Sequence, residues 1–399
     1  MVAIGSSDDS EVAIPAEVTI PAGETTAVVT VKAIDDKFLD GTQSVTITTT
    51  AAGFSDQSVV VDVLDDNGTA YLHGRVLVLK GADGIDDDIT LSEADGMVAV
   101  DLNGAEYSFD VSDYVRIEVS TYGGDDSVLA ETVSTKIDAR MSSGDDTFVG
   151  GAGNDVVRTG TGRDSIIANA GDDFVSAATG IDTVTGGVGD DRLKLGNGAD
   201  IANAGEGDDT VNAGGGRDSV VGSSGNDLLR GGSKRDTING GSGDDTIFGG
   251  SGADVLIGSS GDDLIDGENA NDSISGGSGR DFLIGRTGQD TLTGGAGEDL
   301  LLSATTSLTD EELFSISAEW SSSRHYTERL GNVRGGSGKT SDRLNTAFLV
   351  GRERPEEVQT AFADSSKDRL LGGTDDDAFF AALTDKISNK FGDEWLELL

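Results

Sequence analysis

The chain has 399 residues and a formal net charge of −45, since 73 acidic side chains outnumber 28 basic ones. Nucleic acids and anionic membrane surfaces repel such a chain, so both are excluded as partners and cations are favoured. Cysteine is absent from the sequence, which excludes disulfides and thiolate metal ligands. No apolar run reaches the roughly 18 residues of a membrane-spanning helix, so membrane insertion is not expected.

Residues 1–68 are predicted to form an incomplete β-sandwich. Four segments alternate apolar and polar residues as strands do, and they begin at Glu17, Thr25, Gln43 and Gln57. They resemble the C-terminal part of a Calx-β immunoglobulin-like domain, a family in which acidic residues at one end of the sandwich bind calcium. The resemblance implies this role for Asp35, Asp36, Asp65 and Asp66, which could equally be solvated turn residues. The opening strands of that family are missing and leave an edge exposed, so we expect the start of the chain to be a truncation or an internal start.

Residues 69–140 are predicted to form an irregular β ladder that leads into the next segment. They alternate apolar and polar residues between acidic turns. Ile117 and Ile137 are twenty residues apart, as are Asp126 and Asp146, and this spacing is close to the eighteen-residue period that follows.

Residues 141–302 consist of eighteen consecutive nine-residue units without an insertion. Position eight is apolar throughout, and position four is glycine except at Lys234 and Ala270. Position six is aspartate in every unit: Asp146, Asp155, Asp164, Asp173, Asp182, Asp191, Asp200, Asp209, Asp218, Asp227, Asp236, Asp245, Asp254, Asp263, Asp272, Asp281, Asp290 and Asp299. Disordered acidic linkers do not keep such a register, so a repeating fold is predicted.

Each unit is predicted to make a glycine-rich turn of six residues and a strand of three, with one side chain pointing inward. Two units make one coil, and coils stack at ~4.8 Å into two parallel sheets with position eight between them. The expected fold is all-β: a parallel β-roll solenoid, with a partial β-sandwich before it and a small mixed cap after it.

Stacking places each position-six aspartate over the one eighteen residues later, which gives column 1 from Asp155 to Asp299 and column 2 from Asp146 to Asp290. Neighbouring carboxylates ~5 Å apart repel by roughly 1 kcal/mol even in water, so the metal-free roll is not expected to hold. A divalent cation between coils reverses this repulsion, and folding and metal binding become one event. Ligand sets made only of oxygen select a hard cation, and calcium tolerates irregular geometry better than magnesium.

The nonapeptide resembles the GGxGxDxUx repeat of RTX (repeat-in-toxin), or hemolysin-type calcium-binding, proteins. The stretch DTINGGSGDDTIFGGSGAD at residues 236–254 fits that pattern over its whole length. The resemblance covers residues 141–302 and implies several calcium ions held by position-six carboxylates and by turn carbonyls of neighbouring coils. The turn glycines singled out are Gly241, Gly243, Gly250 and Gly252. Units 168–176 and 177–185 lack the double glycine, which puts their calcium binding in doubt.

The two columns are predicted to be unequal because their position-five residues differ. Column 1 carries acids at Asp172, Asp190, Asp208, Asp244, Asp262 and Glu298, against Arg280 alone. Column 2 carries Arg163, Arg217 and Arg235, only one acid at Asp145, and both units without the position-four glycine. Fixed cations lower the local calcium concentration, so column 1 is expected to bind calcium more tightly. The alternative is that these cations only relieve repulsion on a solvated edge.

Residues 303–399 are predicted to be a capping segment. The sequence TDEE from Thr309 is a capping-box pattern that opens a helix containing Leu313, Phe314 and Trp320. Two further nonapeptides occupy 363–371 and 372–380, with Asp368 and Asp377 at position six and Leu370 and Phe379 inward.

Outward positions of the roll turn apolar late, at Val255, Ile257, Phe282, Ile284, Leu300 and Leu302. We expect the C-terminal segment to cover them, because an open roll end would invite end-to-end growth. The family resemblance also implies an uncleaved C-terminal signal for type I secretion.

No catalytic site is predicted. His73 and His325 lie in neither HExxH nor near a GxSxG elbow, and surface positions explain both. GGSGKTSD at 335–342 lacks the spacing of a phosphate-binding loop.

The sequence therefore predicts a non-enzymatic, extracellular or cell-surface calcium-binding module, the C-terminal part of a larger bacterial protein. One alternative is the tail of a secreted protease, lipase or polysaccharide-modifying enzyme whose catalytic domain lies upstream. Another is an adhesin with a surface, matrix or protein partner. Adhesion to ice or polysaccharide would require a flat array of threonines or aromatics at position seven, where the threonines singled out are too scattered: Thr183, Thr210, Thr237, Thr246 and Thr291.

Overall fold

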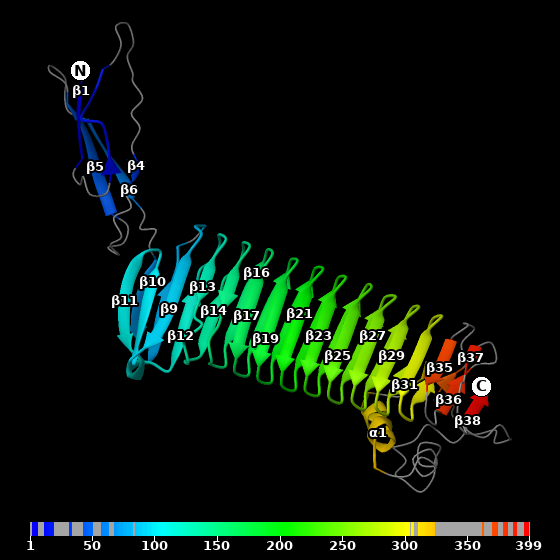
Figure 1. Cartoon of the computed structure of the whole chain (residues 1–399). Coiled ribbons are helices and arrows are strands. Elements are labelled where there is room, and N and C mark those ends of the chain that lie inside the picture. The colour runs from blue at the N-terminus through cyan, green and yellow to red at the C-terminus, as the bar shows by residue number, and fades with distance from the viewer. Residues whose placement is uncertain are drawn as a thin grey trace.

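The computed structural model of the chain describes residues 2–6, 12–19, 32–33, 43–50, 57–63, 68–82, 84–303, 305–306, 310–323, 361–362, 369–373, 378–381, 386–388 and 395–398. Its largest part is a solenoid of two 15-stranded sheets, in which coil follows coil along one axis (Figure 1). Sheet 1 contains the strands that follow column 1, and sheet 2 contains those that follow column 2. The predicted all-β solenoid is confirmed.

Sheet 1 consists, in chain order, of β7 (Thr69–His73), β8 (Val76–Lys80), β12 (Arg116–Ser120), β14 (Ile137–Arg140), β16 (Val156–Thr161), β18 (Phe174–Thr179), β20 (Arg192–Asn197), β22 (Thr210–Gly215), β24 (Leu228–Ser233), β26 (Thr246–Ser251), β28 (Leu264–Asn269), β30 (Phe282–Ile284), β32 (Leu300–Leu302), β36 (Ala378–Ala381) and β38 (Trp395–Leu398). Sheet 2 consists of β9 (Asp88–Ala94), β10 (Met97–Leu102), β11 (Ala105–Asp110), β13 (Ser127–Leu129), β15 (Thr147–Val149), β17 (Ser165–Ala170), β19 (Thr183–Val188), β21 (Ile201–Glu206), β23 (Ser219–Ser224), β25 (Thr237–Ser242), β27 (Val255–Ser260), β29 (Ser273–Ser278), β31 (Thr291–Ala296), β35 (Arg369–Gly373) and β37 (Lys386–Ser388).

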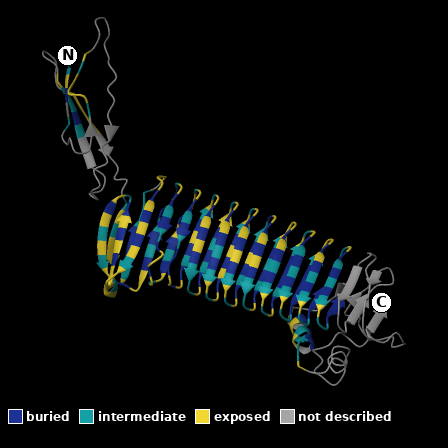
Figure 2. Cartoon of the chain, in the orientation of Figure 1, coloured by how far each residue is buried: buried dark blue, intermediate teal, exposed yellow. Residues whose placement is uncertain are grey.

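Strand pairing confirms the eighteen-residue coil. Ile247 of β26 pairs in parallel with Leu229 of β24 and with Ile265 of β28. The position-eight side chains of both sheets meet in one continuous core. Buried and exposed residues accordingly alternate along the strands (Figure 2).

The strands are longer than predicted. A typical strand such as β26 covers six residues, positions seven to nine of one unit and one to three of the next. Position one is therefore a second inward position, and it is buried in all eighteen units. The prediction of one inward side chain per unit holds for the eleven units with glycine at position one and is wrong for the seven with a side chain there. Because position one is most often glycine, it leaves no hydrophobic signal in the sequence.

The stack continues beyond the eighteen units at its N-terminal end. Strands β8, β12, β14 and β16 are parallel neighbours in sheet 1, and β9, β13 and β15 are parallel neighbours in sheet 2. The end is closed by antiparallel strands, the hairpin β7–β8 and the meander β9–β10–β11. A short 3-10 helix, η1 (Val111–Asp113), follows the meander.

At the C-terminal end, strands of the two further nonapeptides join the stack. Leu370 of β35 pairs with Leu292, and Phe379 of β36 pairs with Leu301. Strands β37 and β38 then add one more rung, which the sequence reading did not predict. The position-six residues Asp368 and Asp377 lie outside the described residues.

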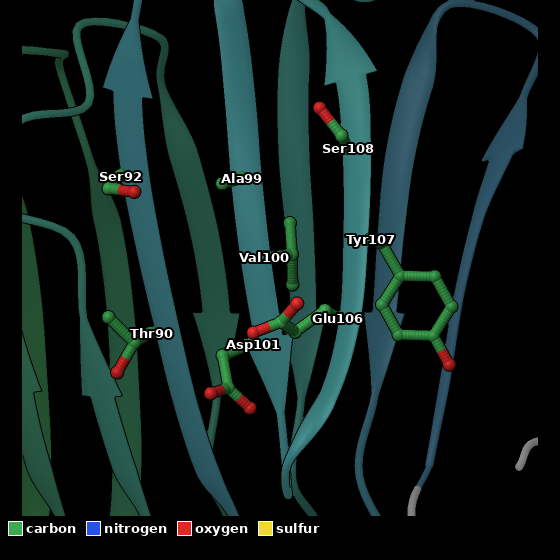
Figure 3. A pocket seen from close by; sticks show the side chains of 8 residues that line it. All are labelled: Thr90, Ser92, Ala99, Val100, Asp101, Glu106, Tyr107 and Ser108. Carbon is green, nitrogen blue, oxygen red and sulfur yellow. The ribbon is translucent and has the colours of Figure 1, made fainter. Parts of the chain in front are cut away.

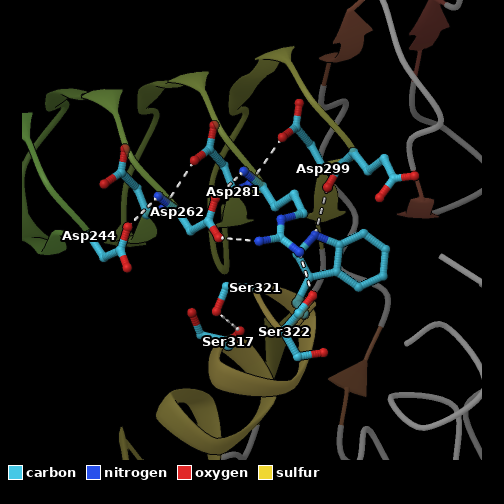
Figure 4. Close-up of polar contacts among 11 residues, drawn as sticks. Asp244, Asp262, Asp281, Asp299, Ser317, Ser321 and Ser322 are labelled. Carbon is cyan, nitrogen blue, oxygen red and sulfur yellow. Dashed lines mark hydrogen bonds and ion pairs between the residues drawn. The ribbon is translucent and has the colours of Figure 1, made fainter. Parts of the chain in front are cut away.

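Helix α1 (Asp310–Trp320) lies against the late part of the roll (Figure 4). Leu313, Ile316 and Trp320 are buried, and the Trp320 indole N–H donates to the Glu298 carbonyl oxygen at 2.8 Å. The Arg280 guanidinium donates to the Ser322 carbonyl oxygen. The predicted helix is thus confirmed, while Thr309, its expected cap, lies outside the described residues.

The predicted apolar patch is in fact divided between the two faces. Four members lie on sheet 1, where they are buried: Phe282, Ile284, Leu300 and Leu302. Val255 and Ile257 lie in β27 of sheet 2 and are only half-buried. The error arose because successive units alternate between sheets, so residues close in sequence face opposite ways.

The N-terminal segment forms a separate antiparallel sheet in the order β3–β1–β5–β6. Its strands are β1 (Val2–Ser6), β3 (Glu17–Val18), β5 (Gln43–Thr50) and β6 (Gln57–Val63). Two small pairs are β2 (Val12–Ala13) with β4 (Lys32–Ala33) and β33 (Thr305–Thr306) with β34 (Ala361–Phe362). The likeness to a Calx-β domain stays a prediction, and its four acidic residues at 35–36 and 65–66 lie outside the described residues.

Candidate calcium-binding columns

The position-six aspartates form two hydrogen-bonded ladders inside the roll. All eighteen are at most 3% exposed. From Asp146 to Asp281, the backbone N–H of each donates to Oδ1 of the aspartate eighteen residues later, at 2.6–3.0 Å. Figure 4 shows this contact between Asp281 and Asp299. The structure thus stacks the position-six aspartates at intervals of eighteen residues, as the repeat pattern predicts.

The second carboxylate oxygen, Oδ2, is buried without a hydrogen-bond partner in the sixteen aspartates from Asp146 to Asp281. Burying a charged oxygen without a partner is strongly unfavourable. In native proteins such an orphaned oxygen calls for an explanation, and a bound ion is one.

At glycines of position one, an Oδ2 atom and a backbone carbonyl oxygen of the next coil lie close to a common point, the position that a Cβ atom would occupy. A Cβ atom added to Gly222 would lie 2.2 Å from Oδ2 of Asp227 and 2.5 Å from the carbonyl oxygen of Gly240. In the other column, a Cβ added to Gly231 would lie 2.6 Å from Oδ2 of Asp236 and 2.7 Å from the carbonyl oxygen of Gly249. In such glycine units, position one is therefore a small cradle in which oxygens from two coils converge.

These carboxylate and carbonyl oxygens are ligands of the kind that calcium prefers. Within the described part of the chain, no three acidic or histidine side chains converge on one point, so carboxylates alone cannot complete a site. Calcium takes six to eight oxygens and readily accepts backbone carbonyls among them. Carboxylates of adjacent coils together with turn carbonyls supply such a set.

The turn glycines named from the sequence line the same edges. Gly241, Gly243 and Gly250 have φ angles of +119°, +118° and +103°, which L side chains rarely adopt. A Cβ on Gly252 would lie 1.8 Å from the carbonyl oxygen of Lys234 in the preceding coil. These positions bring the turn backbones of neighbouring coils into close contact, and their role as carbonyl ligands stays a prediction.

Burial raises the pKa of the position-six carboxyl groups from Asp146 to Asp281 above the ordinary value. The pKa reaches about 8 at Asp146, Asp173, Asp263 and Asp272, first because of desolvation and then because of neighbouring aspartates. Hydrogen bonds from the backbone oppose the shift but do not cancel it. Near neutral pH the metal-free columns therefore hold either protons or uncompensated charge.

Two further aspartates belong to column 2, and the sequence reading missed them as site residues. The N–H of Asp87 donates to Oδ1 of Asp126 at 2.9 Å, and the N–H of Asp126 donates to Oδ1 of Asp146 at 3.0 Å. Both side chains are buried. The twenty-residue spacing from Asp126 to Asp146 was the signal that could have revealed them.

A second ladder, at position five, was also missed. In column 1 the N–H of Asp208 donates to Asp190, that of Asn226 to Asp208 and that of Asp244 to Asn226, at 2.7–2.9 Å. The side chain accepts from the following coil, whereas a position-six side chain accepts from the preceding one. Figure 4 shows the continuation at Asp244 and Asp262. Because Asn226 serves as well as aspartate, this ladder depends on the acceptor oxygen rather than on charge.

The two halves of the roll differ at position one. From Gly222 onward all nine units have glycine there, whereas seven of the nine earlier units have a side chain. Those residues are Met141, Thr159, Ala168, Ala177, Leu195, Ala204 and Ala213, and all are buried. The six apolar ones belong to the hydrophobic core and add to its burial.

We therefore expect residues 222–302 to depend on calcium more strongly than residues 141–221. In chelator, backbone amides of the first half should keep partial protection from hydrogen exchange, and those of the second half should keep none. Peptide-resolved hydrogen exchange at increasing calcium concentration checks this. Equal protection of the two halves at every concentration would contradict it.

The remaining residues considered for chemistry are dispersed. His73 is exposed, while His325 and residues 335–342 lie outside the described residues. A shallow hollow on β9–β11 is lined by polar side chains that include Thr90, Asp101, Glu106 and Tyr107 (Figure 3). Its lining contains no histidine, lysine or arginine, so it offers no nucleophile–base pair of the usual kind.

Comparison with known families supports the reading of the repeats. The family model described as the RTX calcium-binding nonapeptide repeat (4 copies) matches at residues 142–175, 149–184, 185–220, 195–229, 221–256, 248–283 and 275–304. RTX repeats bind calcium, and the number of repeats here implies several ions. No curated protein matches the chain. Among the described residues, no helix has the length and apolar character to cross a membrane.

Proposed function

We propose that this chain, whose residues 142–304 carry RTX calcium-binding repeats, is an extracellular structural module that folds as it binds several calcium ions. The observation that carries the proposal is the pair of buried aspartate columns. Their Oδ2 atoms lack hydrogen-bond partners from Asp146 to Asp281 and face carbonyl oxygens of the next coil. Calcium supplies the positive charge that makes this arrangement stable.

The proposed ligands are the eighteen position-six carboxylates, together with turn carbonyls such as those of Gly241, Gly243, Gly250 and Gly252. The chain's own residues hold the coils in register through the Oδ1 ladder and leave the other carboxylate oxygen for the ion. Oxygens of two neighbouring coils would hold each ion, so the ordering of one coil would favour the ordering of the next. Extracellular calcium is concentrated enough to fill sites of moderate affinity.

RTX repeats typically occur in secreted proteins, which supports an extracellular location and export by a type I system. The roll itself is a non-catalytic module. A second candidate function, the tail of a secreted protease, lipase or polysaccharide-modifying enzyme, requires a catalytic domain elsewhere in a longer protein. Sequencing the gene upstream of Met1 distinguishes the two candidates.

Circular dichroism of the full chain tests the calcium proposal directly. In chelator we expect residues 141–302 to be largely unfolded, and addition of calcium should produce a β-sheet spectrum. The midpoint should be on the order of 10⁻⁴–10⁻³ M, as in other extracellular modules. Magnesium at equal concentration is the control and should be much less effective, because it requires near-octahedral geometry. A full β-sheet spectrum in chelator at neutral pH would refute the proposal.

A further inference from the structure

Charged side chains are sorted by face along the roll. The six strands of sheet 1 from β16 to β26 carry four cations and no acid. The six strands of sheet 2 from β17 to β27 carry no cation and one acid, Glu206. Between β16 and β26 the outer face of sheet 1 is therefore a basic surface on a chain whose net charge is −45.

Three of these cations stand in one column across the strands. Parallel pairing aligns Arg158 with Ser176, Ser176 with Lys194, Lys194 with Asn212 and Asn212 with Arg230. A cation thus alternates with a neutral hydrogen-bonding side chain. Because neighbouring strands lie ~4.8 Å apart, the cations repeat every ~9.6 Å along the solenoid axis.

The middle of this column is open to solvent. Lys194 and Asn212 are exposed, and together with Ser176 they line a shallow groove that also contains Thr179 and Asn197. Arg192 is exposed next to them on the same strand. Among the described residues, neither Arg192 nor Lys194 takes part in an ion pair.

The two end cations are held in place by aromatic rings. The Arg158 guanidinium lies 5.5 Å from the centroid of Phe174, and that of Arg230 lies 4.3 Å from the centroid of Phe248. Cation–π contacts of this kind restrict the side chains without removing their charge. Arg158 also reaches Asp138 at 3.4 Å, at the margin of the column. The cations are therefore partly ordered before any ligand arrives, which lowers the entropic cost of binding.

Relief of acidic repulsion does not account for this column. Cations that serve that purpose lie in the turns beside the aspartates, as Arg163 and Arg217 do at position five. Arg158, Lys194 and Arg230 are instead at position nine, in the middle of the face. A ligand that carries negative charge at the same period explains their spacing.

We propose that the outer face of sheet 1 binds a linear acidic polysaccharide with one carboxylate per disaccharide, which runs along the solenoid axis. The cation repeat of ~9.6 Å is close to the length of an extended β-linked disaccharide. Carboxylates pair with Arg158, Lys194 and Arg230, and the hydroxyl groups of the intervening neutral sugars bond to Ser176 and Asn212. This site goes beyond the calcium function, although the roll must be folded by calcium for the column to exist.

The test measures binding of end-labelled hyaluronate decasaccharide, which has one carboxylate per disaccharide, to the full chain in saturating calcium. The double variant Arg192→Gln/Lys194→Gln removes the two exposed cations of strand β20, which take part in no ion pair among the described residues. Its dissociation constant should rise on the order of tenfold, since each exposed ion pair contributes a modest amount. The matched control Arg163→Gln/Arg217→Gln removes the same charge from the turns and should bind as the unchanged chain does. Circular dichroism confirms in each case that calcium has folded the roll.

Three comparison ligands test whether binding depends on negative charge and on its spacing. A neutral oligosaccharide of equal length should not bind, and oligogalacturonate, with a carboxylate on every sugar, should bind more weakly than hyaluronate. A single-stranded DNA of similar length should also bind more weakly, because acidic turns flank the face. Absence of hyaluronate binding to the folded chain overturns the proposal. So does equal weakening in both double variants, or tighter binding of oligogalacturonate or DNA.

Discussion

Lowering the pH in the absence of calcium is expected to order the roll. Burial raises the pKa of Asp209, Asp236 and Asp281 to about 7 and that of Asp146 and Asp263 to about 8. In the unfolded chain the value is about 3.9. Because the folded pKa is the higher one, folding takes up protons, and the metal-free roll is most stable when these groups are neutral.

Because the pKa values are raised in the folded state, protonation stabilises the metal-free roll at low pH and not at high pH. Stabilisation by protonation is fully present below about pH 4, and it is lost as the pH rises through the folded values of about 6 to 8. We expect circular dichroism of the chelated chain to show increasing β structure between pH 8 and pH 5. The titration should stop near pH 5, because the isoelectric point of about 4.1 favours precipitation. With calcium present the dependence reverses, since calcium requires ionised carboxylates and its midpoint rises as the pH falls.

Asparagine substitutions provide a matched control for the pH effect. Asp245→Asn/Asp263→Asn imitates the protonated state inside column 1, and it should increase β structure of the chelated chain at pH 7. Asp208→Asn/Asp244→Asn removes the same charge from exposed position-five residues and should change the spectrum little. If the chelated chain stays unfolded at pH 5, or if both double variants behave alike, burial of the columns is not what keeps the metal-free roll open.

Alanine substitution is expected to weaken calcium-driven folding more in column 1 than in column 2. The compared aspartates are matched in environment: the pKa of Asp245 and Asp236 is raised to about 7, and that of Asp263 and Asp272 to about 8. Their surroundings differ at position five, which is an acid before Asp245 and Asp263, Arg235 before Asp236, and the neutral Asn271 before Asp272. Each substitution also leaves one buried N–H without its acceptor, a cost of about 1–3 kcal/mol that is common to all four.

The structure adds a second reason for unequal columns. Lys234 and Ala270 replace the position-four glycine in column 2, and their φ angles are +74° and +91°. Side chains with a Cβ are strained in this region, which costs of order 1–3 kcal/mol for each residue. The affected turns are those that lead into Asp236 and Asp272, because Lys234 and Ala270 each lie two residues before these aspartates. This strain reduces the free energy that calcium binding at these turns can release.

Calorimetric and spectroscopic calcium titrations of Asp245→Ala, Asp263→Ala, Asp236→Ala and Asp272→Ala decide the question. We expect the midpoint to rise several-fold more for the first two variants than for the last two. Asp245→Asn separates the two causes, because it keeps an acceptor for the Asp227 N–H while it removes the charge. Equal shifts, or larger shifts for Asp236 and Asp272, would mean that the position-five arginines serve only to relieve repulsion.

Much of the fold could be predicted because the repeat is encoded by side chains with strong preferences. Aspartate at position six and an apolar residue at position eight recur without interruption, so the register of Leu229, Ile247 and Ile265 follows directly. The same reasoning identified the nonapeptides that contain Leu370 and Phe379, whose strands pair with those of Leu292 and Leu301 across a gap of some sixty residues. Periodicity of this kind survives interruption because each coil contacts only its neighbours.

The features that could not be predicted depend on the side of the sheet on which a residue lies, or on the side-chain atom that forms its hydrogen bond. Glycine at position one carries no pattern, so the second inward position was not evident. Asp190 and Asp208 were interpreted only as charges, although their side-chain oxygens accept the backbone N–H groups of Asp208 and Asn226. The scatter of Thr183, Thr210 and Thr237 arose from reading the units in chain order, whereas the two sheets separate them. Sorting units by sheet also revealed the basic column on sheet 1.

Because the position-six aspartates are buried, the effective net charge of the folded protein differs from the formal charge of its sequence. Eighteen of the 73 acidic side chains belong to the interior of the folded roll, where bound calcium or protons neutralise them. The folded form should therefore migrate in an electric field, and elute from an anion exchanger, as a much less acidic protein than its composition suggests. Unfolding by chelation releases those carboxylates to solvent, so electrophoretic mobility reports the state of the columns without any spectroscopic signal.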